Sequence, residues 1–225
     1  MGHSDNLKKE LQEAEMEKNK LRTNLYAHKY RGDLPIDIFC NLLKAKADKL
    51  LSQKGILKEF KIDNDNREII RQLYLYFIGS DECKWNIHAG IILAGKIGCG
   101  KTLLMTSYIQ LSNELINKQI TSFHSKDLAD VIKEKGIKEI LQRPILIDEL
   151  GREEAEVKDF GTVIRPIVEL ISARYEIGAR TYATTNFKIE PLTEKYGDFI
   201  VSRLLEMCNY IIMPGDSKRN SNVIK

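Results

Sequence analysis

The chain has few cysteines, four in 225 residues, and none is spaced as a C-x-x-C pair or as a metal site. Isolated cysteines of this kind are typical of reduced thiols in a cytosolic protein and argue against a disulfide or zinc framework. No apolar run is long enough to span a membrane, and the N-terminal residues lack the apolar segment of a signal peptide. We therefore predict a cytoplasmic protein without a membrane partner.

The sequence also lacks a strong charge imbalance, an internal repeat and a low-complexity tract. Its 35 basic and 32 acidic residues give a net charge of +3, which permits contact with nucleic acid but does not require it. Basic and aromatic residues are scattered, so they define no DNA-contact surface. A hydrophobic share of 43% supports a packed core, and the length fits one large domain with or without an appendage.

The most specific motif is G-K-I-G-C-G-K-T at residues 95–102, which matches the phosphate-loop pattern G-x-x-x-x-G-K-[ST] at every fixed position. A predicted buried strand precedes it and a predicted helix, 101–117, follows. Glycines let backbone N–H groups approach phosphate oxygens, and the helix N-terminus favours negative charge. We expect Lys101 to reach the β- and γ-phosphates and Thr102 to coordinate magnesium. The predicted nucleotide-binding residues are Gly95, Lys96, Ile97, Gly98, Cys99, Gly100, Lys101, Thr102 and Leu103.

A second motif, I-L-I-D-E at residues 145–149, is an apolar run that ends in two acids and has the form of a Walker B motif. A buried strand would place Asp148 beside the phosphate loop, where it can hold Mg²⁺ directly or through water. Glu149 would then polarise the attacking water as a general base. Asn186 follows the next predicted strand, 180–184, and can hydrogen-bond the γ-phosphate or the water. These motifs predict ATP and Mg²⁺ as cofactors.

From residue 64 onward, short apolar segments alternate with helical patterns, which predicts a parallel sheet covered on both faces. The expected fold is a three-layer α/β/α P-loop fold with a central five-stranded parallel sheet. Ligands of such sheets bind at the carboxyl ends of the strands, where the motifs fall. The strands are predicted at residues 90–94, 120–124, 144–148, 180–184 and 210–213. The helices are predicted at residues 67–79, 101–117, 126–135, 157–177 and 198–208, and within 157–177 Pro166 is predicted to begin a new helix or to kink one.

The N-terminal part has a different pattern. Apolar residues at helical spacing predict helices at about 6–29 and at 36–53, separated by the turn signal R-G-D-L-P at 31–35. These helices either cover the main core or dock a partner protein. We therefore divide the chain into an N-terminal helical segment, residues 1–58, and an ATPase domain, residues 59–225.

In their order, these motifs resemble an AAA+ ATPase of the DnaC/IstB type over residues 64–219. The segments GCGKTLL, IDELG and RYEIGART resemble the family's GxGKTHL, IDDLG and RY..GK.T, while SRL and GDSKR fit its arginine-finger segment and closing GxSxR. Leu103, Glu149 and Ala179 stand where the family usually has histidine, aspartate and lysine. The residues before the core have little similarity to the helicase-binding domain that this family would lead us to expect.

The resemblance implies an ATP-dependent switch in DNA replication that self-associates with ATP and engages a replicative helicase, single-stranded DNA or both. It implies that Arg203 is an arginine finger for a neighbouring subunit's nucleotide and acts in catalysis with Lys101, Glu149 and Asn186. The chain stops soon after its last predicted strand, so we expect no C-terminal helical lid, and Arg219 becomes a candidate second sensor. An IstB-like helper of transposition that recruits a transposase, and a non-hydrolysing nucleotide-bound adaptor, stay open as alternatives.

Overall fold

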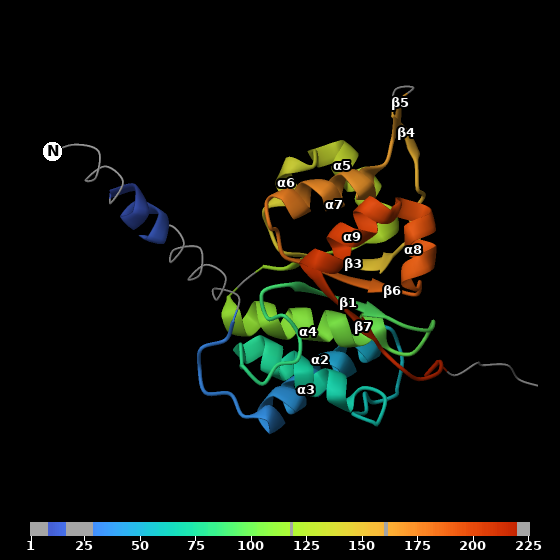
Figure 1. The fold of residues 1–225 in the computed structure, drawn as a ribbon. Coiled ribbons are helices and arrows are strands. Elements are labelled where there is room, and N and C mark those ends of the chain that lie inside the picture. Colours follow the sequence, from blue (N-terminus) through green and yellow to red (C-terminus); the bar gives the residue numbers. More distant parts are fainter. Residues whose placement is uncertain (1–8, 17–28, 118, 160–161, 220–225) are drawn as a thin grey trace, which may run out of the picture.

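A parallel sheet lies at the centre of the molecule (Figure 1). The computed structural model describes residues 9–16, 29–117, 119–159 and 162–219. Within these residues the central sheet has five strands in the order β2-β3-β6-β1-β7, all parallel, which confirms the predicted topology. The strands of this sheet are β1 (Gly90–Ala94), β2 (Thr121–His124), β3 (Ile145–Leu150), β6 (Thr181–Thr185) and β7 (Cys208–Ile212).

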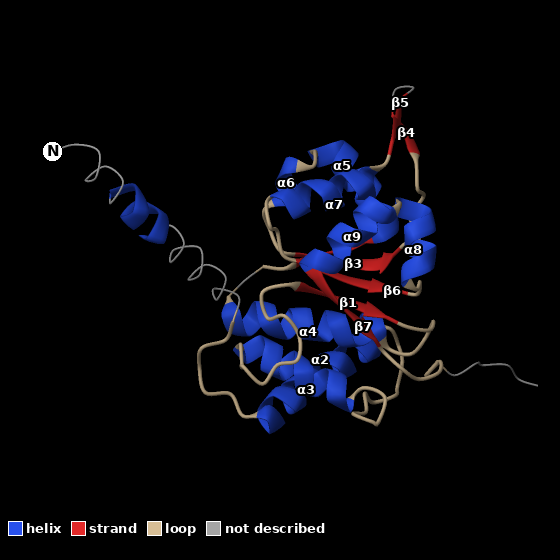
Figure 2. Ribbon diagram, in the orientation of Figure 1, coloured by secondary structure: helices blue, strands red, loops and turns tan. Residues whose placement is uncertain are grey.

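Helices cover both faces of the sheet and complete the three layers (Figure 2). None of the described helices is both long and apolar enough to cross a membrane. On one face lie α2 (Ile36–Gln53), α3 (Arg67–Ile78) and α4 (Lys101–Ile116). On the other lie α5 (Ser125–Lys135), α6 (Lys138–Leu141), α7 (Pro166–Glu176), α8 (Ile189–Tyr196) and α9 (Asp198–Met207).

β1 is apolar along its whole length because both faces of the sheet are covered. All five residues of β1 are buried. Side chains alternate between the faces of a strand, so Ile91 and Leu93 join the hydrophobic core under α2, α3 and α4, while Ile92 joins the core under α7, α8 and α9. This double burial fixes the register of β1 and therefore the position of the loop that follows it.

The N-terminal helices are described in part. Residues 9–16 are helical, and the rest of the predicted helix 6–29 lies almost entirely outside the described residues. The second predicted helix is confirmed with the same bounds as α2, and its Phe39 and Leu43 are fully buried in the core shared with α3 and α4. The division at residue 58 stays a prediction, but α2 belongs to the same hydrophobic core as the phosphate-loop helix.

One predicted element is wrong. Instead of a helix that begins at residue 157, β4 (Val157–Asp159) and β5 (Thr162–Ile164) form an antiparallel pair that projects from the body. Three of these six residues are valine or isoleucine and one is threonine, and such β-branched residues favour strands over helices. Pro166 begins α7, which is one of the two roles predicted for it, because proline's fixed φ suits the first helical position.

Candidate functional site

The phosphate loop connects β1 to the N-terminus of α4 at the carboxyl edge of the sheet. Gly98 and Gly100 have φ values of +84° and +106°, in the left-handed region that favours glycine. The first N–H groups of α4, a helix of 16 residues, have no partner within the helix and can bind an anion. These features fit a triphosphate. Of the other predicted loop residues, Ile97 is exposed, Cys99 is buried and Leu103 is partly buried in the first turn of α4.

The Lys101 side chain contacts the backbone of this loop. Its side-chain Nζ donates hydrogen bonds to the carbonyl oxygens of Gly95 and Lys96 and to Oδ1 of Asn186, each at 2.8 Å. Burial lowers the pKa of the Lys101 ammonium from its ordinary value. The amine therefore joins the loop to the residue that follows β6, so two of the predicted site residues lie in contact.

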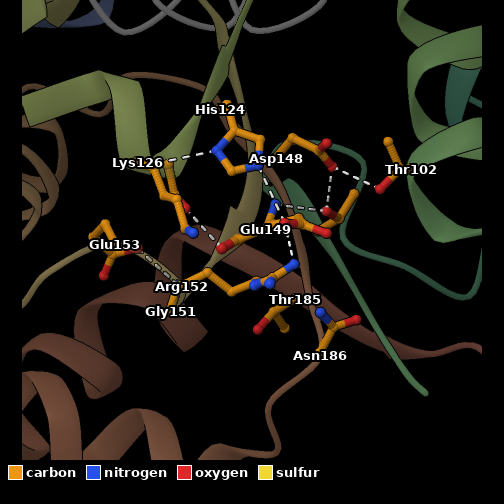
Figure 3. A network of polar contacts seen from close by, with 12 residues as sticks. Thr102, His124, Lys126, Asp148, Glu149, Gly151, Arg152, Glu153, Thr185 and Asn186 are labelled. Atoms are coloured by element: carbon orange, nitrogen blue, oxygen red, sulfur yellow. Dashed lines mark hydrogen bonds and ion pairs between the residues drawn. The ribbon is translucent and has the colours of Figure 1, made fainter. Parts of the chain in front are cut away.

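Asp148 lies opposite the start of α4. Its Oδ1 accepts a hydrogen bond from Thr102 Oγ1 at 2.9 Å and another from Thr184 Oγ1 at 2.6 Å (Figure 3). Within the described residues no group of three or more His, Cys, Asp or Glu side chains could hold a metal by itself. Mg²⁺ usually takes one or two protein ligands and completes its shell with phosphate oxygens and water, so Thr102 and Asp148 fit a magnesium ion that arrives with a nucleotide.

β3 is irregular where the two acids lie. Successive side chains of a regular strand point to opposite faces. The pairing of β3 with β6 shifts register between Ile147 and Leu150, and Glu149 has a φ of +60°. A bulge of this kind redirects side chains, and a left-handed non-glycine residue costs roughly 1–3 kcal/mol. The Glu149 N–H donates to Thr184 Oγ1 at 3.0 Å, which helps to hold the bulge.

The Glu149 carboxylate lies between two basic side chains (Figure 3). Its Oε2 is 3.1 Å from His124 Nε2, at the end of β2, and accepts a hydrogen bond of 2.7 Å from Arg152. The Glu149 carbonyl accepts a further hydrogen bond from Ser125 Oγ at 2.8 Å. The proposed base is therefore held in place by β2, the start of α5 and the turn after β3.

Arg203 and Arg219 are not brought into this network. Arg203 forms an ion pair of 2.6 Å with Glu176, and its guanidinium carbon lies 4.0 Å from the ring centre of Phe199 and 4.8 Å from that of Tyr175. Arg219 is exposed, and its backbone N–H donates to Ser217 at 3.3 Å. The structure thus unites Lys101 with Asn186 and Thr102 with Asp148 beside Glu149, but leaves both arginines outside.

The sequence motifs did not predict three of the contacting side chains, His124, Arg152 and Thr184, as site residues. Each lies at or just after the carboxyl end of a strand of the sheet, which is where α/β ligand sites occur. Their position at the end of a predicted strand was the sequence signal that could have identified them. The contacts of His124 and Thr184 depend on strand order, because β2 and β6 flank β3 in the sheet, whereas Arg152 pairs with Glu149 three residues before it.

Comparison with known proteins supports the fold. No protein-family model matches the chain, and no curated protein matches its sequence. The solved structure of the DnaC helicase loader matches with a TM-score of 0.55 and 21% identity, over 69% of this chain and 93% of that one. A candidate primosome component from Streptococcus pyogenes serotype M3 matches with a TM-score of 0.54 and 16% identity, over 70% and 84%. A DNA replication initiation factor matches with a TM-score of 0.52 and 14% identity, over 70% and 48%.

The fold and the phosphate-loop geometry define the class: the chain has the P-loop α/β fold of the AAA+ proteins. Within that class it has the fold of the DnaC helicase loader, which confirms at the level of the fold the resemblance that the sequence motifs predict. At these identities the likeness concerns the fold alone.

Proposed function

We propose that this chain is an ATP-dependent molecular switch of DNA replication, which binds MgATP, self-associates, hydrolyses the nucleotide and engages a replicative helicase, single-stranded DNA or both. The observation that carries the proposal is the convergence of four motif residues at one edge of the sheet. Lys101 contacts Asn186, and Thr102 contacts Asp148, across two separate strands. The likeness of the fold to that of a helicase loader supports the role in replication.

Different residues would bind the phosphates and the magnesium ion. Lys101 would exchange its hydrogen bonds with the loop carbonyls for bonds to the β- and γ-phosphates, while the N–H groups of the loop and of α4 face the remaining oxygens. Bound Mg²⁺ would neutralise phosphate charge and polarise the reacting phosphoryl group. Thr102 and Asp148 already contact each other at the place where that ion would be held.

Hydrolysis would use Glu149 and Asn186. Glu149 would accept the proton of the attacking water as its oxygen bonds to the γ-phosphorus and the bond to the bridging oxygen breaks. Asn186 would orient that water or the γ-phosphate through its amide. Arg203 of a neighbouring copy would stabilise the charge on the transferring group. Arg219 would act as the second sensor in the same chain.

The binding step is tested with Lys101→Ala. Charge-assisted hydrogen bonds contribute about 1.5–3 kcal/mol each, so the loss of two or more should weaken MgATP binding at least about 100-fold. Titration of a fluorescent ATP analogue measures the affinity. Lys84→Ala is the matched control, because Lys84 is an exposed lysine paired with Glu68 outside the site. Equal affinity of Lys101→Ala and the parent would contradict the site assignment.

Two alternative functions predict different experimental results for this protein. An adaptor in which the nucleotide is structural would bind MgATP without turnover, whereas Glu149 and Asn186 at the site favour hydrolysis. A transposition helper would capture a transposase, whereas the proposed loader captures the replicative helicase in the presence of ATP. Co-purification with each candidate, with Lys101→Ala as the control that cannot bind nucleotide, distinguishes the two.

A further inference from the structure

The chain that follows β7 runs beside the phosphate loop and is bonded to it. The Met213 N–H donates to the carbonyl oxygen of Ala94 at 2.7 Å, just before the loop. The Lys218 N–H donates to the carbonyl oxygen of Gly98 at 2.9 Å, in the middle of the loop. A third contact is the ion pair between Lys96 and Asp216, at 2.6 Å. Residues 213–218 therefore contact the last residue of β1 and two residues of the loop, Lys96 and Gly98.

The glycines of the loop are also in direct contact with this segment. A Cβ atom at Gly95 would lie 2.5 Å from the Met213 carbonyl oxygen, and one at Gly98 would overlap the Ser217 side chain. Real Cβ atoms do not approach other atoms so closely. The absence of side chains at Gly95 and Gly98 thus lets residues 213–218 pack against the loop backbone as well as permitting the backbone angles of the loop.

The same segment is tied to the chain that precedes α3. Lys218 Nζ forms ion pairs with Asp63 at 2.5 Å and with Asp65 at 3.7 Å, and Lys58 Nζ donates to the Lys218 carbonyl at 3.2 Å. The hydrogen bond from Lys218 lowers the pKa of Asp63 below its ordinary value. Lys218 therefore bridges the phosphate loop, through its N–H, and the residues before α3, through its side chain.

We propose that residues 213–218, which we name the C-terminal strap, hold the phosphate loop in its nucleotide-binding shape, and that Lys218 is the positioning residue of the strap. The inference rests on the proposed nucleotide site and deepens it. A loop with three glycines has much backbone freedom to lose when it closes around a phosphate. Contacts that restrict the loop beforehand lower that cost and raise affinity by preorganisation.

Two variants of Lys218 separate its contacts. Lys218→Ala removes the ion pairs with Asp63 and Asp65 but keeps the N–H, whereas Lys218→Pro also removes the N–H that donates to Gly98. Partly exposed ion pairs contribute little, so Lys218→Ala should weaken MgATP binding about two- to fivefold. Lys218→Pro also loses the backbone hydrogen bond, so its affinity for MgATP should fall about tenfold or more. Lys84→Ala again serves as the control.

A second measurement needs no nucleotide. Hydrogen–deuterium exchange of the ligand-free protein should become faster at residues 95–100 in Lys218→Pro, while the amides of β1, β3 and β6 keep the exchange of the parent. That pattern separates a loosened loop from a destabilised fold. The expected result for Lys218→Pro is therefore weaker MgATP binding together with faster exchange confined to the loop.

Three results would overturn the proposal. These are unchanged affinity in Lys218→Pro, lower affinity without faster loop exchange, and faster exchange throughout the sheet. A parent protein that does not bind MgATP would instead refute the proposed function and, with it, the positioning role. Because the exchange of the free loop is measured separately, a failure of the strap and a failure of nucleotide binding are distinguishable.

Discussion

Glu149 has the most constrained surroundings of the proposed catalytic residues. Its backbone is left-handed, its N–H donates to Thr184, and its carboxylate is paired with Arg152 and lies 3.1 Å from His124. Both side-chain contacts involve Oε2. In the proposed mechanism, the ion pair with Arg152 would restrain this carboxylate until nucleotide or a partner rearranges the site.

This residue-level arrangement predicts a gain of activity. Arg152→Ala should raise the ATP turnover of the free protein about two- to fivefold, because a partly exposed ion pair contributes about 0.2–1 kcal/mol. Steady-state phosphate release measures it. Arg71→Ala is the control, since Arg71 is an exposed arginine that pairs with Glu68 and Glu82. A loss of turnover comparable to that of Glu149→Gln would show that Arg152 positions the base instead of restraining it.

At the scale of elements, local sequence patterns predicted most helices and strands, because helices and strands differ in the spacing of their apolar residues. The 18 residues of α2 have the predicted bounds, and the five sheet strands lie within about two residues of theirs. Residues 157–164 were predicted as helix but form strands, since their β-branched residues outweigh the helical spacing that we inferred, and the helices α6 and α8 were not predicted. The packing partners of α2 could be identified only from the structure. The apolar face of a helix indicates that the face is buried, but it does not indicate which elements bury it.

The packing of α2 gives a stability prediction. Phe39 is fully buried against Phe77, so Phe39→Ala should lower the free energy of unfolding by about 3–5 kcal/mol. Urea denaturation followed by circular dichroism measures the change. Ile38→Ala on the same helix is the matched control, because Ile38 is 43% exposed and should cost less than about 1 kcal/mol. Equal midpoints for the two variants would mean that α2 unfolds separately from the rest of the chain.

At the scale of the whole molecule, we propose that the site is shared between copies. Arg203 lies on α9, paired with Glu176 and stacked on Phe199, whose side chain is 64% exposed. None of these partners belongs to the phosphate loop or to the end of β3. The Arg203 side chain is 17% exposed, so it would have to exchange its contact with Glu176 to reach the nucleotide of another subunit, the role that the family resemblance implies.

ATP-dependent assembly tests this arrangement. With a slowly hydrolysed ATP analogue, the parent should show an increase in mass by sedimentation velocity, and Arg203→Ala should sediment as without nucleotide. Nucleotide affinity of the variant should equal that of the parent, since Arg203 contacts no residue of its own site. Assembly of Arg203→Ala like that of the parent, at matched protein concentrations, would exclude the finger role. Arg71→Ala controls for the loss of one surface charge.

The sequence by itself determined the P-loop class, the parallel sheet and the residues that converge on the nucleotide edge. Phosphate loops, apolar strands and helical faces are encoded over a few neighbouring residues, so Lys101 and Asp148 could be assigned from local pattern. Only the tertiary structure decided that His124 and Arg152 hold Glu149 and that Lys218 contacts Gly98. The contacts of His124 and Lys218 join residues far apart in the chain and depend on the order of the strands and on the path taken after β7, while the contact of Arg152 forms in the turn that follows the bulge. Those features arise from packing of the whole fold, which no short stretch of sequence specifies.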